Sequence, residues 1–180
     1  MTRQRVGVVD DQAGISLIEV IMYSTLTAVV LSILAGLLYA GFQAQAVTGD
    51  RNNATGSAMV VSNSLQTSIR NASAVAVTSR RLMARVADGT SGWQCAAWAL
   101  TDDDSVVYKV ASSAITGTDY ASWTVLATGA TGGLTGGAAF SGSETEVTYS
   151  FRFVSGTVTV PVAGAATATA FGPGSPESCW

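Results

Sequence analysis

A long apolar stretch dominates the first quarter of the chain. Residues 15–42 contain one charged side chain, Glu19, and no proline. As an α-helix, a segment of this length would extend about 42 Å, whereas the hydrocarbon core of a bilayer needs about 20 apolar residues. The pattern therefore predicts a membrane-spanning helix over 15–42.

Apolar residues continue at helical spacing beyond this segment, although polar residues now separate them. The positions that share the stripe are Val47, Ala54, Ala58, Val61, Leu65 and Ile69. Spacings of three, four and seven predict an amphipathic continuation of the helix over 43–73, with its apolar stripe packed on a globular domain. Gly49 and Gly56 weaken the helix locally, so a melted or kinked turn near Gly49 is one interpretation.

The pattern changes near residue 74 to short segments of alternating polarity separated by turns. The candidate strands are Ala74–Thr78, Leu82–Val86, Gln94–Leu100, Val106–Val110, Ser122–Leu126, Glu146–Phe153 and Thr157–Val160. Alternation is clearest in Glu146–Phe153, which places four apolar side chains on one face. We expect residues 74–180 to form an antiparallel β-sheet domain packed on the helix, which makes the chain α+β. Gly129–Gly142 lacks the lysine of a phosphate-binding loop and is expected to be a flexible loop.

Composition narrows the function classes. The 180 residues carry a net charge of −3, only 12% are charged, and there is no histidine. The charge gives the chain as a whole no electrostatic attraction to nucleic acid. The missing histidine removes the commonest general base and metal ligand. The sequence therefore predicts a non-enzymatic, extracytoplasmic domain on a membrane stem, without a cofactor or a metal.

Two cysteines, Cys95 and Cys179, lie far apart in the chain. On the exported side of a membrane, an even count favours one disulfide, with two unpaired thiols as the alternative. A bridge closing a loop of this size contributes at most about 4–5 kcal/mol in the chain-entropy model.

Three interpretations compete for the N-terminal region. Residues 1–14 are polar and contain Arg3 and Arg5, which favour a cytoplasmic N-terminus. The apolar segment is a secretory signal cut after Ala46, an uncleaved anchor, or a helix in which Glu19 has a specific partner.

A carboxylate in an apolar span is costly, so Glu19 either extends to the lipid headgroups or has a partner. A cut after Gly14 would create an amine on Ile15, one helical turn from Glu19.

The run Gly14-Ile15-Ser16-Leu17-Ile18-Glu19-Val20 resembles the type IV prepilin signature. The resemblance covers residues 1–50 and implies a leader, 1–14, that prepilin peptidase removes between Gly14 and Ile15. It also implies N-methylation of Ile15 and a role for Glu19 in subunit docking. Ile15 replaces the commoner phenylalanine, and the stem lacks a mid-helix proline. The first of these departures favours a minor pilin or pseudopilin, because substituted first residues are commoner in that group.

The resemblance further implies where the protein resides and what it contacts. The expected location is the cell membrane, with the C-terminal domain outside the cytoplasm, and then a pilus or fimbrium. The expected partners are the lipid bilayer, other pilin or pseudopilin subunits and the inner-membrane assembly platform.

Two other functions remain open from the sequence. A tip subunit could bind DNA or a surface ligand through the local basic residues Arg70, Arg80, Arg81 and Arg85, which ordinary surface charge also explains. The other alternative is a simple membrane-anchored secreted domain.

The acidic run at residues 102–104 has two interpretations, a calcium site or a solvated turn. The tryptophans, Trp93, Trp98, Trp123 and Trp180, are expected to be core or capping aromatics.

Overall fold

The computed structural model describes residues 14, 16–89, 92–170 and 179–180. The chain forms two compact units, residues 1–45 and 46–180. One long helix, α1 (Leu17–Arg70), is followed by antiparallel strands, which confirms the predicted α+β class. The leader, apart from Gly14, lies outside the described residues.

The first unit contains the N-terminal part of α1. The absence of proline and the leucine-, alanine- and isoleucine-rich composition favour a continuous helix here. Its most apolar 18-residue window has a mean hydropathy of 2.1, so α1 is long and apolar enough to cross a membrane.

In the second unit, the rest of α1 provides one side of the core. Its buried residues are Ala54, Ala58, Val61, Leu65 and Ile69. These belong to the predicted stripe, but Val47 is 48% exposed, so its assignment to the core is wrong. Gly49 lies within α1, because one glycine costs a helix only about 1 kcal/mol.

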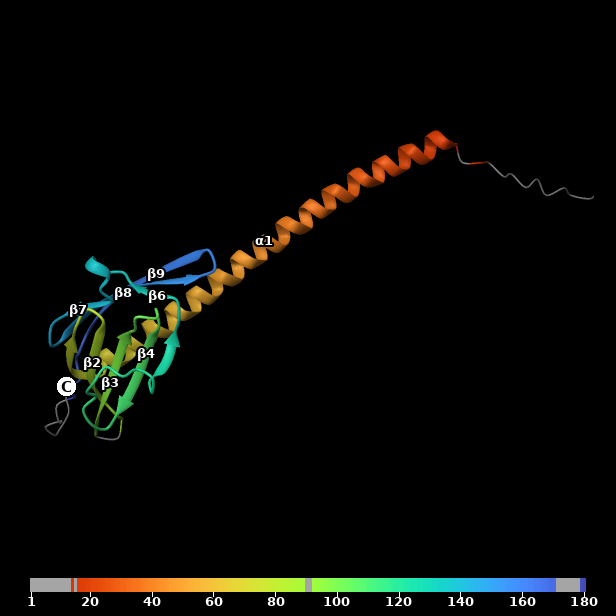
Figure 1. The fold of residues 1–180 in the computed structure, drawn as a ribbon. Helices are drawn as coiled ribbons and strands as arrows, with labels where there is room; N and C mark the ends of the chain where they lie inside the picture. Colours follow the sequence, from red (N-terminus) through yellow and green to blue (C-terminus); the bar gives the residue numbers. More distant parts are fainter. Residues whose placement is uncertain (1–13, 15, 90–91, 171–178) are drawn as a thin grey trace, which may run out of the picture. The chain divides into compact units, whose positions relative to one another are not determined.

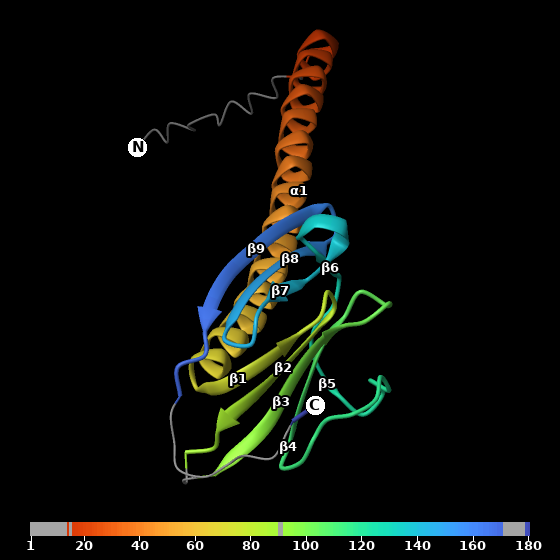
Figure 2. The same cartoon turned by 90° about the vertical axis from the view of Figure 1, so that its left-hand side faces the viewer.

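Two antiparallel sheets complete the second unit (Figures 1 and 2). The first has the order β1-β2-β3-β4-β5. Its strands are β1 (Ala72–Val77), β2 (Arg81–Ala87), β3 (Trp93–Leu100), β4 (Val106–Ala111) and β5 (Thr124–Ala127). The second contains β6 (Ala130–Gly132), β7 (Phe140–Gly142), β8 (Glu146–Ser155) and β9 (Val158–Thr167). In it, β8 pairs with β6 and β7 on one edge and with β9 on the other.

The glycine-rich segment 129–142 is not the flexible loop that the sequence suggested. It contains β6, a short 3₁₀ turn, η1 (Thr135–Gly137), and β7. A side chain at Gly132 would collide with the backbone of Gly137 and Ala138. The glycines therefore allow two backbone segments to lie close together. From the sequence alone, they indicate a flexible loop.

Strand β9 is also longer than predicted, since it continues beyond Val160 to Thr167. Pro161 interrupts the pattern, but β9 is bonded only to β8, and a proline is tolerated in an edge strand.

The shared core joins α1 to both sheets through apolar packing and three hydrogen bonds. The Tyr149 hydroxyl of β8 lies 2.8 Å from Ser62 Oγ and accepts a hydrogen bond from Gln66 Nε2 at 2.9 Å. On the other sheet, Trp98 Nε1 donates to Ser64 Oγ at 3.0 Å. Three polar residues of α1 thus satisfy the buried polar groups of two core aromatics.

The turn between β8 and β9 lies against α1, and we expect Gly156→Ala to destabilise this contact. Gly156 has φ +53°, and a Cβ there would collide with the Asp50 carboxylate, which accepts a hydrogen bond from Ser155 Oγ at 3.2 Å. Left-handed backbone costs a non-glycine residue about 1–2 kcal/mol before any collision. The free energy of unfolding should therefore fall by about 2–3 kcal/mol, as measured by denaturant titration of the detergent-solubilised chain.

Gly117→Ala is the matched control. Gly117 also has positive φ, at +86°, but a Cβ there meets nothing within 4 Å. Gly117→Ala should lower the free energy of unfolding only by the cost of left-handed backbone, about 1–2 kcal/mol. Equal losses in the two variants would contradict a contribution from Asp50.

Candidate functional site

The predicted processing segment lies at the start of α1. Gly14 is exposed and lies outside the helix. The Ser16 carbonyl accepts hydrogen bonds from the amides of Glu19, at 3.0 Å, and Val20, at 3.2 Å, and these begin the first turn. Ile15 lies outside the described residues, so the structure provides no geometry for its cleavage or methylation.

Glu19 is exposed in the first turn of α1. A negative charge is favoured there because helix N-termini carry partial positive charge. Arg80–Asp102 is the ion pair found among the described residues, and it does not involve Glu19. Among the residues that the structure describes, the Glu19 carboxylate has no ion-pair partner.

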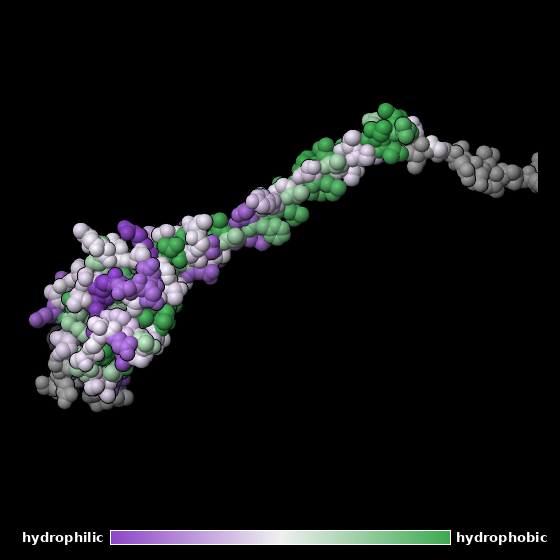
Figure 3. All heavy atoms as spheres, in the orientation of Figure 1, coloured by the Kyte–Doolittle hydropathy of each residue, from purple (hydrophilic) through white to green (hydrophobic). Residues whose placement is uncertain are grey.

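The helix surface around Glu19 is apolar and uncovered. Every described residue from Ser16 to Gly49 is exposed, and Figure 3 shows the apolar atoms along this part of α1. Large side chains are exposed throughout, including Leu17 at 80% and Phe42 at 67%. A surface of this kind needs lipid or another protein to remove it from water. A Cβ at Gly36 or Gly41 would meet nothing within 4 Å, so packing inside this chain does not require glycine there.

The basic residues proposed for DNA binding are mostly engaged within the domain. Arg80 donates to the carbonyls of Leu100 and Thr101 and pairs with Asp102 at 3.1 Å. Arg81 and Arg85 also have internal partners. Arg81 binds the carbonyls of Ile115 and Gly117, and its guanidinium lies over Trp123. Arg85 binds Ser73 and lies over Trp93. These contacts hold loops and strands in place and do not favour a surface for nucleic acid.

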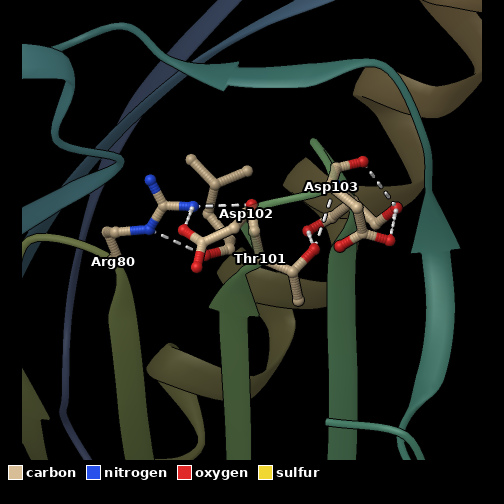
Figure 4. A network of polar contacts seen from close by, with 6 residues as sticks. Arg80, Thr101, Asp102 and Asp103 are labelled. Carbon is tan, nitrogen blue, oxygen red and sulfur yellow. Dashed lines mark hydrogen bonds and ion pairs between the residues drawn. The ribbon is translucent and has the colours of Figure 1, made fainter.

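The acidic run 102–104 forms a tight turn between β3 and β4 (Figure 4). Thr101 Oγ1 donates to the Ser105 carbonyl at 2.9 Å, and Asp104 has φ +58°. Hydrogen bonds, first from the Thr101 side chain and then from its own backbone amide, lower the pKa of Asp103. Within the described residues, no group of three or more Asp, Glu, Cys or His side chains could hold a metal ion. The geometry is that of a solvated turn.

The predicted disulfide is formed between Cys95 of β3 and Cys179, 84 residues apart. Trp98 and Trp123 are buried as expected, whereas Trp180 remains 44% exposed. Sequence reasoning missed Ser62, Ser64 and Gln66 as partners of core aromatics. Their only sequence signal is polarity beside the apolar stripe.

Comparison with known proteins identifies no relative. No protein-family model matches the chain, and neither a curated protein nor a solved structure matches it. The resemblance to prepilins therefore rests on residues 14–20 and on the apolar segment that follows them.

Proposed function

We propose that this chain is a structural subunit of a type IV pilus or related pseudopilus, in the manner of a minor pilin. The observation that supports this most directly is the uncovered apolar part of α1, with one carboxylate in its first turn. This helix is joined to a disulfide-bonded β-domain whose core is closed by the second half of the same helix.

In the proposed mechanism, α1 anchors the subunit in the membrane before assembly and packs against other subunits after it. Before assembly, the bilayer covers the apolar surface of α1. During assembly, the inner-membrane platform transfers the subunit to a filament, where helices of neighbouring subunits replace the lipid. The Glu19 carboxylate then pairs with the N-terminal amine of a neighbouring subunit. In a low-dielectric surrounding, such a pair fixes the register between the helices of neighbouring subunits, because a shifted register would leave a charge buried and unpaired.

The proposed role involves no catalysis by this chain. The sequence has no histidine, and Arg80 and Arg81 donate to backbone carbonyl groups inside the domain. The covalent chemistry of maturation is assigned to prepilin peptidase, which would cleave between Gly14 and Ile15 and methylate the new amine.

The first test is the N-terminal sequence and intact mass of the mature membrane-bound protein. We expect a start at Ile15, with or without one added methyl group. Gly14→Val should abolish processing because the predicted cut requires glycine there. Gly7→Val, in the same leader, should leave processing unchanged. A start at Val47 would indicate a secreted domain, and an intact Met1 would indicate a simple anchor; either outcome contradicts the proposal.

A further inference from the structure

A second apolar cluster lies on the face of the β1–β5 sheet that points away from α1. Strand residues alternate between the two faces, so Ala96 and Trp98 join the core shared with α1, whereas Cys95, Ala97 and Ala99 do not. The second cluster also contains Val107, Ile115, Trp123 and Cys179. Its floor on β3 is made of small side chains, so other segments must cover it.

The segment that covers this floor is the connection between β4 and β5, residues 112–123, which we call the strap. It contains no helix or strand. Ile115 and Trp123 are its buried residues, Tyr120 is half-buried, and its other residues are exposed. Because a segment with few internal hydrogen bonds is weakly held, the attachments of the strap decide whether it stays closed.

Ile115 is held by both of its backbone groups. Its amide donates to the carbonyl of Cys179 at 3.1 Å, and its carbonyl accepts from Arg81 Nη2 at 2.5 Å. Arg81 Nη1 also donates to the carbonyl of Gly117 at 2.6 Å. The guanidinium lies 5.4 Å from the centre of the Trp123 ring, so Arg81 contacts the strap at three points.

The second attachment depends on a bond that can be broken. The disulfide to Cys95 fixes Cys179 on β3. The disulfide keeps Cys179 beside β3, where its carbonyl accepts the hydrogen bond from the Ile115 amide (Figure 2 labels β4, β5 and the C-terminus). The core shared with α1 contains neither cysteine.

From these contacts we propose that the Cys95–Cys179 disulfide is a redox-controlled clasp for the strap. In the oxidised chain, Cys179 and Arg81 together close the strap over β3 and β4. In the reduced chain, Cys179 is released, Ile115 loses its amide partner, and the strap opens while the core around α1 stays folded. Opening exposes the small apolar residues of β3 and the Arg81 guanidinium, which binds neutral carbonyls in the closed form.

The chemistry of closure is ordinary thiol–disulfide exchange with a disulfide oxidant. One cysteine thiolate attacks the oxidant's disulfide and releases one of its sulfurs as a thiolate. The second cysteine thiolate then displaces the other sulfur, so the cysteines lose two electrons and the oxidant is reduced to a dithiol. Such oxidants act outside the cytoplasm, and a closed strap therefore distinguishes a subunit that has matured there.

The test is hydrogen exchange, read by mass spectrometry, on the full-length protein in detergent with and without dithiothreitol. Reduction should speed exchange in residues 112–123 at least tenfold and leave β8 unchanged. Chymotrypsin should then cut after Tyr120 in the reduced protein only. The double variant Cys95→Ser/Cys179→Ser should show the open pattern without reductant.

A matched pair of arginine variants separates the clasp from general loosening of the domain. Arg81→Gln removes the other attachment and should speed strap exchange while the disulfide is intact. Arg85→Gln lies on the same strand and face but contacts Ser73 and Trp93, so it should leave the strap unchanged. Unchanged strap exchange on reduction would overturn the proposal. Simultaneous loss of protection in β8 would also overturn it, because the disulfide would then stabilise the whole domain.

Discussion

Replacing Glu19 with glutamine should leave processing at Gly14 intact and reduce incorporation into filaments at least tenfold. The side chain keeps its size and loses only its charge. Glu19 forms no ion pair with a residue that the structure describes, so the change costs the subunit itself little. In the filament, it would leave a neighbour's amine unpaired in an apolar surrounding, and breaking a buried pair in this way costs about 3–5 kcal/mol.

The measurement is the ratio of the subunit in sheared filaments to that in the membrane, with the N-terminus of the membrane pool sequenced in parallel. Glu146→Gln is the matched control, since Glu146 is an exposed carboxylate on β8. It should be incorporated as in wild type. Normal incorporation of Glu19→Gln would remove the docking role of Glu19 while leaving the processing prediction standing.

The parts of the fold that sequence reasoning predicted are those with strong periodicity. The stripe from Ala54 to Ile69 predicted the buried face of α1, because residues at helical spacing must share a surface. The alternation in Glu146–Phe153 predicted β8, in which the four alternating apolar residues, from Val147 to Phe153, are buried on one face. Both patterns are local, and tertiary contacts reinforce them.

The missed elements depend on contacts that are distant in sequence. Strands β6 and β7 have three residues each and exist because β8 offers them an edge. The end of β9 is alanine-, glycine- and threonine-rich, and Gly164 is required because a side chain there would collide with Tyr149. Neither relationship leaves a periodic signal in the sequence.

The candidate functional site also combines features that local sequence predicts with features that only the structure reveals. The order of residues 14–20 is a local motif, so sequence alone suggests the cut and the carboxylate. The structure adds that Glu19 and the apolar surface near it are exposed in the chain. Under the proposed function, a neighbouring subunit covers them, and a contact between two chains leaves no pattern in the sequence of one.

Trp98→Ala should cause the largest loss of stability in the domain, about 3–5 kcal/mol in the free energy of unfolding. Trp98 is fully buried, its ring centre lies 5.0 Å from that of Tyr108, and its indole donates to Ser64 of α1. Truncation therefore creates a cavity between α1 and the β1–β5 sheet and leaves Ser64 without this partner. Denaturant unfolding of the detergent-solubilised chain, followed by circular dichroism, measures the loss.

Two further variants separate packing from hydrogen bonding at this contact. Ser64→Ala removes the hydrogen-bond partner and should cost about 1–3 kcal/mol, because the buried indole N–H is left unsatisfied. Trp98→Phe keeps an aromatic ring and should lie between the two. Because Trp98 is far in sequence from the processing motif, its variants should be cleaved normally. Their defect should be a less stable domain. Glu19→Gln should instead remain stable and fail only in assembly. A Trp98→Ala chain as stable as wild type would show that the helix–sheet contact described here does not hold the domain together.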